Sequence, residues 1–91
     1  MIKGFRCADT KALFETGKCK RFAEIVKVAT RKLAQLDAAQ TLDFLRSPGN
    51  RLEALKSDRK GQFSIRINDQ YRLCFRWTNE GPTDVEIVDY H

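Results

Sequence analysis

Apolar residues recur at intervals of three and four between positions 22 and 36, a spacing typical of an amphipathic helix. The residues of this stripe are Phe22, Ile25, Val26, Ala29, Leu33 and Leu36. Charged and amide side chains fill most positions between them, so one face is expected to be buried. The pattern predicts a helix of about four to five turns that ends near residues 37–39. A shorter helix is expected before it, with Asp9 or Thr10 as its N-cap and Gly17 at its end.

Beyond residue 61 the period of hydrophobicity changes to two, which predicts β-strands. The alternating apolar residues are Phe63, Ile65, Ile67, Tyr71, Leu73, Phe75 and Trp77. Turns are expected at residues 68–70 and 79–82, and a final strand at residues 84–89. Short strands are also expected at residues 2–7 and at residues 51–56, after a turn at residues 47–50.

Helices followed by an antiparallel meander indicate an α+β fold, with the N-terminal helices packed on one face of a small sheet. Side chains alternate between the faces of a strand, so Arg66, Arg72 and Arg76 should share the face opposite the apolar one. With the two lysines and the arginine of residues 56–60, they would form a concave surface able to bind phosphate. Alternatively, these arginines are simply the solvated side of a half-buried sheet.

Length and composition limit the choice of protein class. The chain has 91 residues, and residues 1–91 are expected to form a single domain. No apolar run approaches the roughly 20 residues of a membrane span, and no signal-peptide pattern follows Met1. A cytoplasmic protein without a membrane partner is therefore expected. The three cysteines fit neither a disulfide framework nor a zinc site, and Gly-rich phosphate loops are absent. We expect no metal and no other cofactor.

Charge is unevenly distributed along the chain, although the net charge is only +5. Residues 46–76 hold eight Lys or Arg against three acids, whereas residues 77–91 hold four acids and no Lys or Arg. A basic segment of this kind is typical either of a nucleic-acid-binding surface or of an ordinary solvated one. His91 is the only histidine, and its imidazole can exchange a proton near neutral pH. Metal-free acid–base chemistry on an anionic substrate is thus a candidate function, unless the terminal residue is merely frayed.

Five motifs, in order along the chain, resemble the HigB toxins of bacterial toxin–antitoxin pairs, which belong to the RelE/ParE superfamily. They are Arg51-Leu52-Glu53-Ala54-Leu55-Lys56, Asp58-Arg59-Lys60-Gly61, Ser64-Ile65-Arg66, Tyr71-Arg72-Leu73 and Asp89-Tyr90-His91. The opening Met1-Ile2-Lys3 and residues 33–39 agree as well. The resemblance covers essentially the whole chain, and the GraT-type toxins look especially similar.

The resemblance implies a microbial-ribonuclease-like fold, with two N-terminal helices on a small antiparallel β-sheet. It implies the toxin of a type II toxin–antitoxin system, a ribosome-dependent endoribonuclease that cleaves mRNA in the A site and inhibits translation and growth. The implied partners are the ribosome, mRNA and a HigA-type helix-turn-helix antitoxin, with operator DNA contacted only through the antitoxin complex. Two alternatives stay open: a ParE-like toxin that inhibits gyrase, and a non-catalytic nucleic-acid-binding module.

The resemblance also implies which residues act. The catalytic residues would be Lys56, Arg72, Asp89, Tyr90 and His91, with Glu53 standing where some relatives have a histidine. The expected RNA-binding residues, which come from the basic surface described above and not from the resemblance, are Arg51, Arg59, Lys60, Arg66 and Arg76. In such a reaction a base activates the ribose 2′-hydroxyl, cations stabilise the phosphorane and an acid protonates the leaving oxygen. Arg72 and Lys56 would supply the cations, and His91 would act with Asp89 or Glu53 as acid and base.

Overall fold

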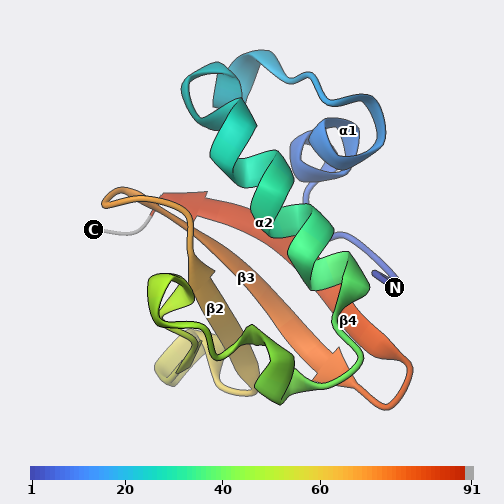
Figure 1. The fold of residues 1–91 in the computed structure, drawn as a ribbon, viewed down its shortest axis with the longest axis vertical. Coiled ribbons are helices and arrows are strands. Elements are labelled where there is room, and N and C mark those ends of the chain that lie inside the picture. Colours follow the sequence, from blue (N-terminus) through green and yellow to red (C-terminus); the bar gives the residue numbers. More distant parts are fainter. Residues whose placement is uncertain (90–91) are drawn as a thin grey trace.

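Two α-helices lie on one face of a four-stranded antiparallel sheet in the computed structural model, which describes residues 1–89 (Figure 1). The helices are α1 (Ala8–Thr16) and α2 (Val26–Ala38). The strands are β1 (Glu53–Ala54), β2 (Gln62–Arg66), β3 (Tyr71–Thr78) and β4 (Gly81–Asp89), and they are neighbours in that order. The expected α+β fold is therefore confirmed.

The hydrophobic core lies between α2 and the sheet. Ala29, Leu33 and Leu36 of α2 are completely buried, as the apolar stripe predicts. The sheet contributes Ile65, Leu73, Phe75, Val85 and Ile87 to the same cluster. Each buried Leu, Ile or Phe side chain contributes about 1.5–3 kcal/mol of transfer free energy, so this layer dominates the stability of the fold. No helix within residues 1–89 is long and apolar enough to cross a lipid bilayer.

The predicted cap of the first helix is wrong. Helix α1 begins at Ala8, with Cys7 at the N-cap, and neither Asp9 nor Thr10 precedes it. The Thr10 hydroxyl is instead fully buried and accepts a hydrogen bond from the Ile87 backbone N–H at 3.0 Å. The predicted end is right, because Gly17 follows the helix in the left-handed conformation that glycine adopts readily.

The second helix is shorter than the apolar pattern of residues 22–36 predicts. Residues Lys20–Ile25 form an irregular 3₁₀ segment, η1, and the regular α-helix begins only at Val26. Phe22 leaves helical geometry with φ −114° and ψ 25°, and its ring meets that of Tyr71 edge-on at 6.1 Å. Tertiary packing of an aromatic side chain thus overrides local propensity at this end. The predicted end near residues 37–39 is confirmed.

The two short strands are smaller than expected. Residues 2–7 form a single parallel bridge, Phe5 to Val85, which is flanked by backbone hydrogen bonds to β4. This segment covers part of the β4 edge. Residues 51–56 contribute only β1, because Arg51 and Ser57 adopt left-handed backbone angles, φ 46° and 57°, on either side of it. Both residues turn the chain out of the extended conformation.

The register of the meander confirms the predicted arginine face and corrects its description. Arg66 pairs with Arg72, so both lie on the face opposite the helices. Ser64 and Cys74 occupy the next paired position on that face, and both are fully buried. The face is therefore not simply solvated. Between β1 and β2, the chain passes through a short 3₁₀ turn, η4 (Ser57–Arg59), whose Arg59 side chain bonds to Gln62 and Glu86 on that face.

Candidate active site

A row of polar side chains crosses all four strands on the face opposite the helices. Directly paired residues place Glu53, Ser64, Cys74 and Glu86 side by side in that order. The two middle members are fully buried, and a carboxylate stands at each end. We call these four residues the cross-strand row. It brings one predicted catalytic residue, Glu53, onto the same face as Arg72.

Arg72 extends over this row. Its Nε donates to Ser64 Oγ at 2.7 Å, and its Nη2 donates to the Arg51 carbonyl oxygen at 2.7 Å. The Arg51 carbonyl comes from the left-handed residue just before β1, so the geometry of that turn helps to aim the guanidinium. A cation held by two bonds, one to β2 and one to the loop before β1, is preorganised, which is what stabilisation of a charged transition state requires.

Cys74 marks the centre of the charged cluster. Burial raises the pKa of the Cys74 thiol, with smaller contributions from the charges of Arg59, Glu86, Arg72 and Glu53. Glu86 is paired directly with Cys74 across β3 and β4, and Glu53 lies further along the same cross-strand row. The neutral thiol itself has the character of a small buried hydrophobe. Two predicted catalytic residues and one predicted RNA-binding residue therefore converge here.

Lys56 stands at the edge of this cluster. It lines, with Glu53, Leu55 and Ser57, a surface depression of about 520 Å³. Lys56 and Glu53 are both exposed. Glu53 therefore belongs both to the cross-strand row, as its first member, and to the lining of the depression.

Asp89 occupies the register position next to that of Arg72 but faces the other way. It pairs with Tyr71, whereas Arg72 pairs with Val88, so Asp89 falls on the opposite side of the sheet. Its Oδ2 accepts a hydrogen bond from Gln70 Nε2 at 3.1 Å. The other two predicted residues of the tail, Tyr90 and His91, lie outside the described residues.

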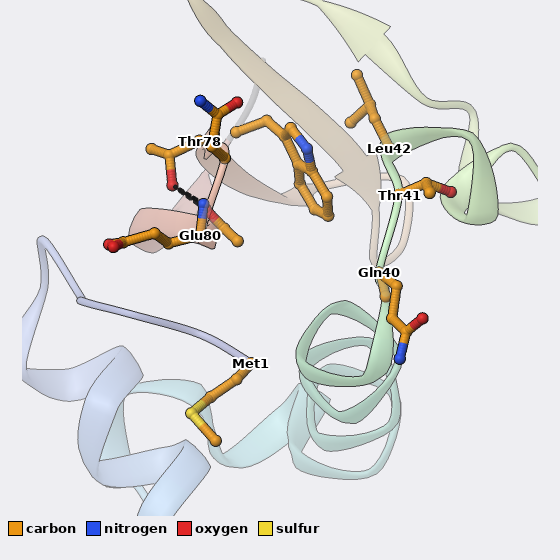
Figure 2. A pocket seen from close by; sticks show the side chains of 10 residues that line it. Met1, Gln40, Thr41, Leu42, Thr78 and Glu80 are labelled. Carbon is orange, nitrogen blue, oxygen red and sulfur yellow. Dashed lines mark hydrogen bonds between the residues drawn. The ribbon is translucent and has the colours of Figure 1, made fainter.

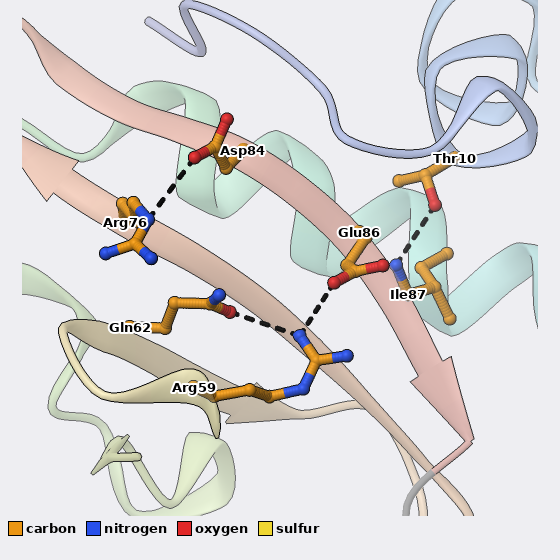
Figure 3. A network of polar contacts seen from close by, with 7 residues as sticks. All are labelled: Thr10, Arg59, Gln62, Arg76, Asp84, Glu86 and Ile87. Atoms are coloured by element: carbon orange, nitrogen blue, oxygen red, sulfur yellow. Dashed lines mark hydrogen bonds and ion pairs between the residues drawn. The ribbon is translucent and has the colours of Figure 1, made fainter. Parts of the chain in front are cut away.

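Three of the predicted RNA-binding arginines form ion pairs. Arg66 pairs with Asp69. Figure 3 shows the other two pairs, in which Arg76 Nε lies 3.3 Å from Asp84 Oδ2 and Arg59 Nη1 lies 2.7 Å from Glu86 Oε1. The first two are surface pairs with largely accessible acids. Glu86 is different, because only 17% of its side chain is exposed. Arg51 and Lys60 are both exposed, and in sequence they flank the segment that lines the depression.

Sequence reasoning missed Ser64, Glu86 and Gln62, which hold the arginines in place. Strand alternation does assign Ser64 to the face of Arg66, although it indicates no role for Ser64, and the same rule extends to Gln62. The contact between Glu86 and Arg59 spans 27 residues, and no local spacing signals it. Asp84, whose left-handed φ of 51° lies at an irregularity of the β3–β4 pairing, was likewise out of reach.

A second depression lies at the other end of the sheet (Figure 2). It has a volume of about 430 Å³ and lies between Met1, the segment after α2 and the β3–β4 turn. Glu80 is the one ionisable side chain among its lining residues. Thr78, on its wall, is six residues from Arg72 along β3, or on the order of 20 Å. This depression is therefore separate from the candidate site.

Comparison with known protein families shows to which family this chain belongs. The family described as the RelE-like toxin of the type II toxin–antitoxin system HigB matches residues 3–91. The chain belongs to the HigB-like toxins. The family resemblance expected from the motifs is confirmed at this level.

Individual relatives agree with the assignment. An endoribonuclease HigB of Proteus vulgaris is 32% identical over 92 residues, covering both chains in full. Toxin HigB-1 of Vibrio cholerae is 56% identical over 50 residues, 54% of this chain and 53% of that toxin. This match thus spans only about half of the Vibrio toxin. The HigB-like chain is homologous over its full length to an endoribonuclease.

Solved structures share the fold. The YoeB–YefM complex from Staphylococcus aureus matches with a TM-score of 0.65 at 20% identity, covering 100% of this chain and 95% of that one. The YoeB dimer from the same organism matches with a TM-score of 0.60 at 23% identity, covering 99% and 94%. The two helices on a four-stranded antiparallel sheet are therefore a YoeB/RelE-like architecture.

Proposed function

We propose that this HigB-like toxin is a metal-independent endoribonuclease that cleaves mRNA in the ribosomal A site and so inhibits translation and growth. The observation that carries the proposal is the Arg72 guanidinium, bonded to Ser64 Oγ and the Arg51 carbonyl beside Glu53. The full-length match to the Proteus vulgaris endoribonuclease supports the reaction type. Cleavage would use the ribose 2′-hydroxyl as the internal nucleophile.

Arg72 and Lys56 would stabilise the pentacoordinate phosphorane. Arg72 would act through a guanidinium whose orientation is fixed before substrate binds, and Lys56 through a flexible ammonium at the depression. Loss of one preorganised donor typically costs about 10²–10³ in rate. Arg72→Ala should therefore lower kcat by about that factor.

Acid and base would be His91 and a carboxylate. Glu53 has the better support as that carboxylate, because it shares the Arg72 face while Asp89 belongs to the opposite one. Tyr90 would stack on a base or hydrogen-bond to the substrate. His91 would protonate the leaving 5′ oxygen or remove the 2′ proton.

RNA would be held by Arg51, Lys60, Arg66 and Arg76, with Arg59 as a further candidate. Exposed ion pairs such as Arg66–Asp69 and Arg76–Asp84 contribute only about 0–1 kcal/mol, so a phosphate can replace the carboxylate at little cost. The physical reason for ribosome dependence is positioning. An A-site codon held by ribosomal RNA arrives oriented, which lowers the entropic part of the barrier.

The proposed partners are the ribosome and a HigA-type helix-turn-helix antitoxin, with operator DNA bound only through the antitoxin complex. Support comes from the toxin–antitoxin family and from the YoeB–YefM complex, whose toxin shares this fold. We also propose that the chain is most similar to the GraT-type toxins, on the ordered set of motifs with which its opening Met1-Ile2-Lys3 and residues 33–39 agree. A cytoplasmic location follows from the ribosomal target.

The test compares the full chain with Arg72→Ala, His91→Ala and a deletion of His91. Each is assayed for growth arrest and for cleavage of mRNA on ribosomes with a vacant A site. We expect all three changes to abolish arrest and to slow cleavage strongly. Normal cleavage by Arg72→Ala would overturn the proposed role of that guanidinium. Growth arrest with intact mRNA and inhibited gyrase supercoiling would instead favour the ParE-like alternative.

A further inference from the structure

Arg59 connects the η4 turn to the far strand of the sheet. Its Nη1 lies 2.7 Å from Glu86 Oε1 and donates to Gln62 Oε1 at 3.2 Å (Figure 3). The side chains of Arg59 and Glu86 are 31% and 17% exposed. Gln62 is fully buried. A guanidinium shared between two acceptors in a partly desolvated position is a structural anchor rather than a mobile surface charge.

The same residue also determines where Lys56 lies. The Arg59 backbone N–H donates to the Lys56 carbonyl at 3.2 Å, which closes the η4 turn. Ser57, at the start of the turn, has a left-handed φ of 57°, a conformation that a residue with a Cβ holds only when its surroundings enforce it. The side-chain anchor of Arg59 therefore acts on the backbone that presents Lys56.

We propose that Arg59 is a positioning residue, whose bonds to Glu86 and Gln62 hold the η4 turn against the sheet so that Lys56 and Glu53 face the substrate beside Arg72. The same anchor lies beside the buried Cys74, because Glu86 pairs with Cys74 across β3 and β4. This inference rests on the proposed RNA-cleaving function for its catalytic consequence, but its structural part does not. It differs from the interpretation that Arg59 binds RNA phosphate.

The two interpretations conflict in their electrostatics. If Arg59 left Glu86 to bind a phosphate, a carboxylate that is mostly buried would lose its ion pair next to a new anion. Breaking a partly buried pair in this way is costly because one charge remains uncompensated. A positioning role keeps the pair intact during the reaction, so Glu86 is as important as Arg59.

Glu86→Gln distinguishes a positioning role of Arg59 from phosphate binding, because the two predict different effects on kcat and on ribosome affinity. The change removes one negative charge and keeps the size of the side chain. If Arg59 positions Lys56, kcat on ribosome-bound mRNA should fall about 10–100-fold while ribosome affinity stays constant, as expected for a small displacement of a catalytic group. If Arg59 binds phosphate, Glu86→Gln should bind the ribosome as tightly or more tightly with kcat unchanged, and that result would overturn the proposal.

Asp84→Asn is the matched control. It makes the same charge change on the same strand, at an ion pair with Arg76 that is more exposed. Asparagine tolerates the left-handed backbone of position 84, so the fold should be unaffected. We expect Asp84→Asn to retain kcat within about twofold, since it removes only an exposed pair. An equal kcat loss in Asp84→Asn and Glu86→Gln would contradict a specific role for Arg59.

Cys74 provides a measurement that needs no activity. In a Cys7→Ser/Cys19→Ser background, Cys74 is the one remaining thiol of the chain. We expect it to react with an aromatic disulfide reagent at least about tenfold faster after Glu86→Gln or Arg59→Ala, because loss of the anchor exposes it. Asp84→Asn should react at the parent rate. Rates are compared well below the unfolding midpoint of every variant, and Arg59→Lys replaces any variant that does not fold.

The two readouts distinguish the possible failures. Unchanged protection of Cys74 in both anchor variants would overturn the positioning role, whatever their activity. A second outcome is that Cys74 reacts faster in the anchor variants while the parent protein leaves ribosome-bound mRNA intact. That result would support the positioning role of Arg59 and overturn the proposed ribonuclease function. Increased reactivity with a lowered kcat and constant affinity supports both.

Discussion

Arg72 differs from the neighbouring arginines of its sheet face in the groups that it contacts. Its guanidinium donates to Ser64 Oγ and to the Arg51 carbonyl, and these acceptors carry no formal charge. The two bonds therefore fix the orientation of the guanidinium. The other two arginines on this face meet the carboxylates of Asp69 and Asp84, which offset their charge. At the scale of single residues, this fixed orientation is what supports the proposed action of Arg72 on a phosphorane.

Ser64→Ala should reduce cleavage without preventing folding. The change removes the acceptor of the Arg72 Nε bond and leaves the guanidinium with less restraint. Hydrogen bonds to charged groups contribute about 1.5–3 kcal/mol, so we expect kcat to fall by about 10–100-fold. Single-turnover cleavage on ribosomes measures the effect. Ser47→Ala, at an exposed serine with no capping bond, is the control, and equal kcat in both variants would refute this role of Ser64.

The cysteines should differ in reactivity at neutral pH. Burial raises the pKa of Cys7 as well, but hydrogen bonds from Thr10 and the nearby Arg21 outweigh it, and the net pKa is lowered. The pKa of Cys74 is raised by burial. Because the thiolate is the reactive form, Cys7 should be alkylated before Cys74, and its rate should rise at a lower pH than that of Cys74. Mass spectrometry of peptides from the folded chain measures this order, and earlier labelling of Cys74 would contradict it.

At the scale of elements, a buried asparagine joins α2 to the segment that leads into β1. Asn50 Nδ2 donates to Gln35 Oε1 at 2.9 Å and to the Leu45 carbonyl at 3.1 Å, and its Oδ1 accepts from Lys32 Nζ. Burial lowers the pKa of Lys32, assisted by the charges of Arg31 and Arg66. Asn50 directly precedes the residue whose carbonyl receives Arg72. The Asn50 side chain thus connects α2 to the backbone that orients Arg72 in the candidate site.

Asn50→Ala should destabilise the whole domain. It removes three hydrogen bonds at a fully buried position and leaves polar groups of the helix and the loop without their partner. Each such group costs about 1–3 kcal/mol, so we expect the free energy of unfolding to fall by about 2–4 kcal/mol. Urea unfolding followed by circular dichroism measures the change. Asn79→Ala in the exposed β3–β4 turn should stay within about 0.5 kcal/mol of the parent, and similar losses in both would argue against a special role for Asn50.

At the scale of the whole molecule, the success of sequence reasoning follows the range of the interactions. Alternation in β2 and β3 predicts the arginine face correctly, because a hairpin fixes its register locally. The N-cap residue predicted for α1 was wrong because the Thr10 side chain bonds to Ile87, which is 77 residues away in sequence. The partner of Arg59 was missed for the same reason. A sequence shows neighbours along the chain, whereas anchors of a site are neighbours in space.

The residues of the candidate site were predicted from the sequence by two kinds of reasoning. Face alternation was enough to place Arg72 opposite the core, and the register bears this out. The roles of Lys56, Asp89, Tyr90 and His91 came only from the family resemblance, and no contact in the described part of the chain tests those roles. Their chemistry depends on the bound RNA as much as on the fold, so the assignment stays a prediction until cleavage is measured.

The distribution of charge over the molecule makes a last prediction, about salt. If the Arg72 face binds RNA, Lys60→Gln should weaken ribosome binding and reduce the slope of log affinity against log salt by about 0.7–0.9, the value for one lost phosphate contact. Lys27→Gln removes the same charge from the exposed side of α2, on the opposite face of the sheet. It should leave the slope unchanged. Binding measured between low and physiological salt provides both slopes. Equal reductions in the two variants would show that overall charge, rather than this face, attracts the RNA.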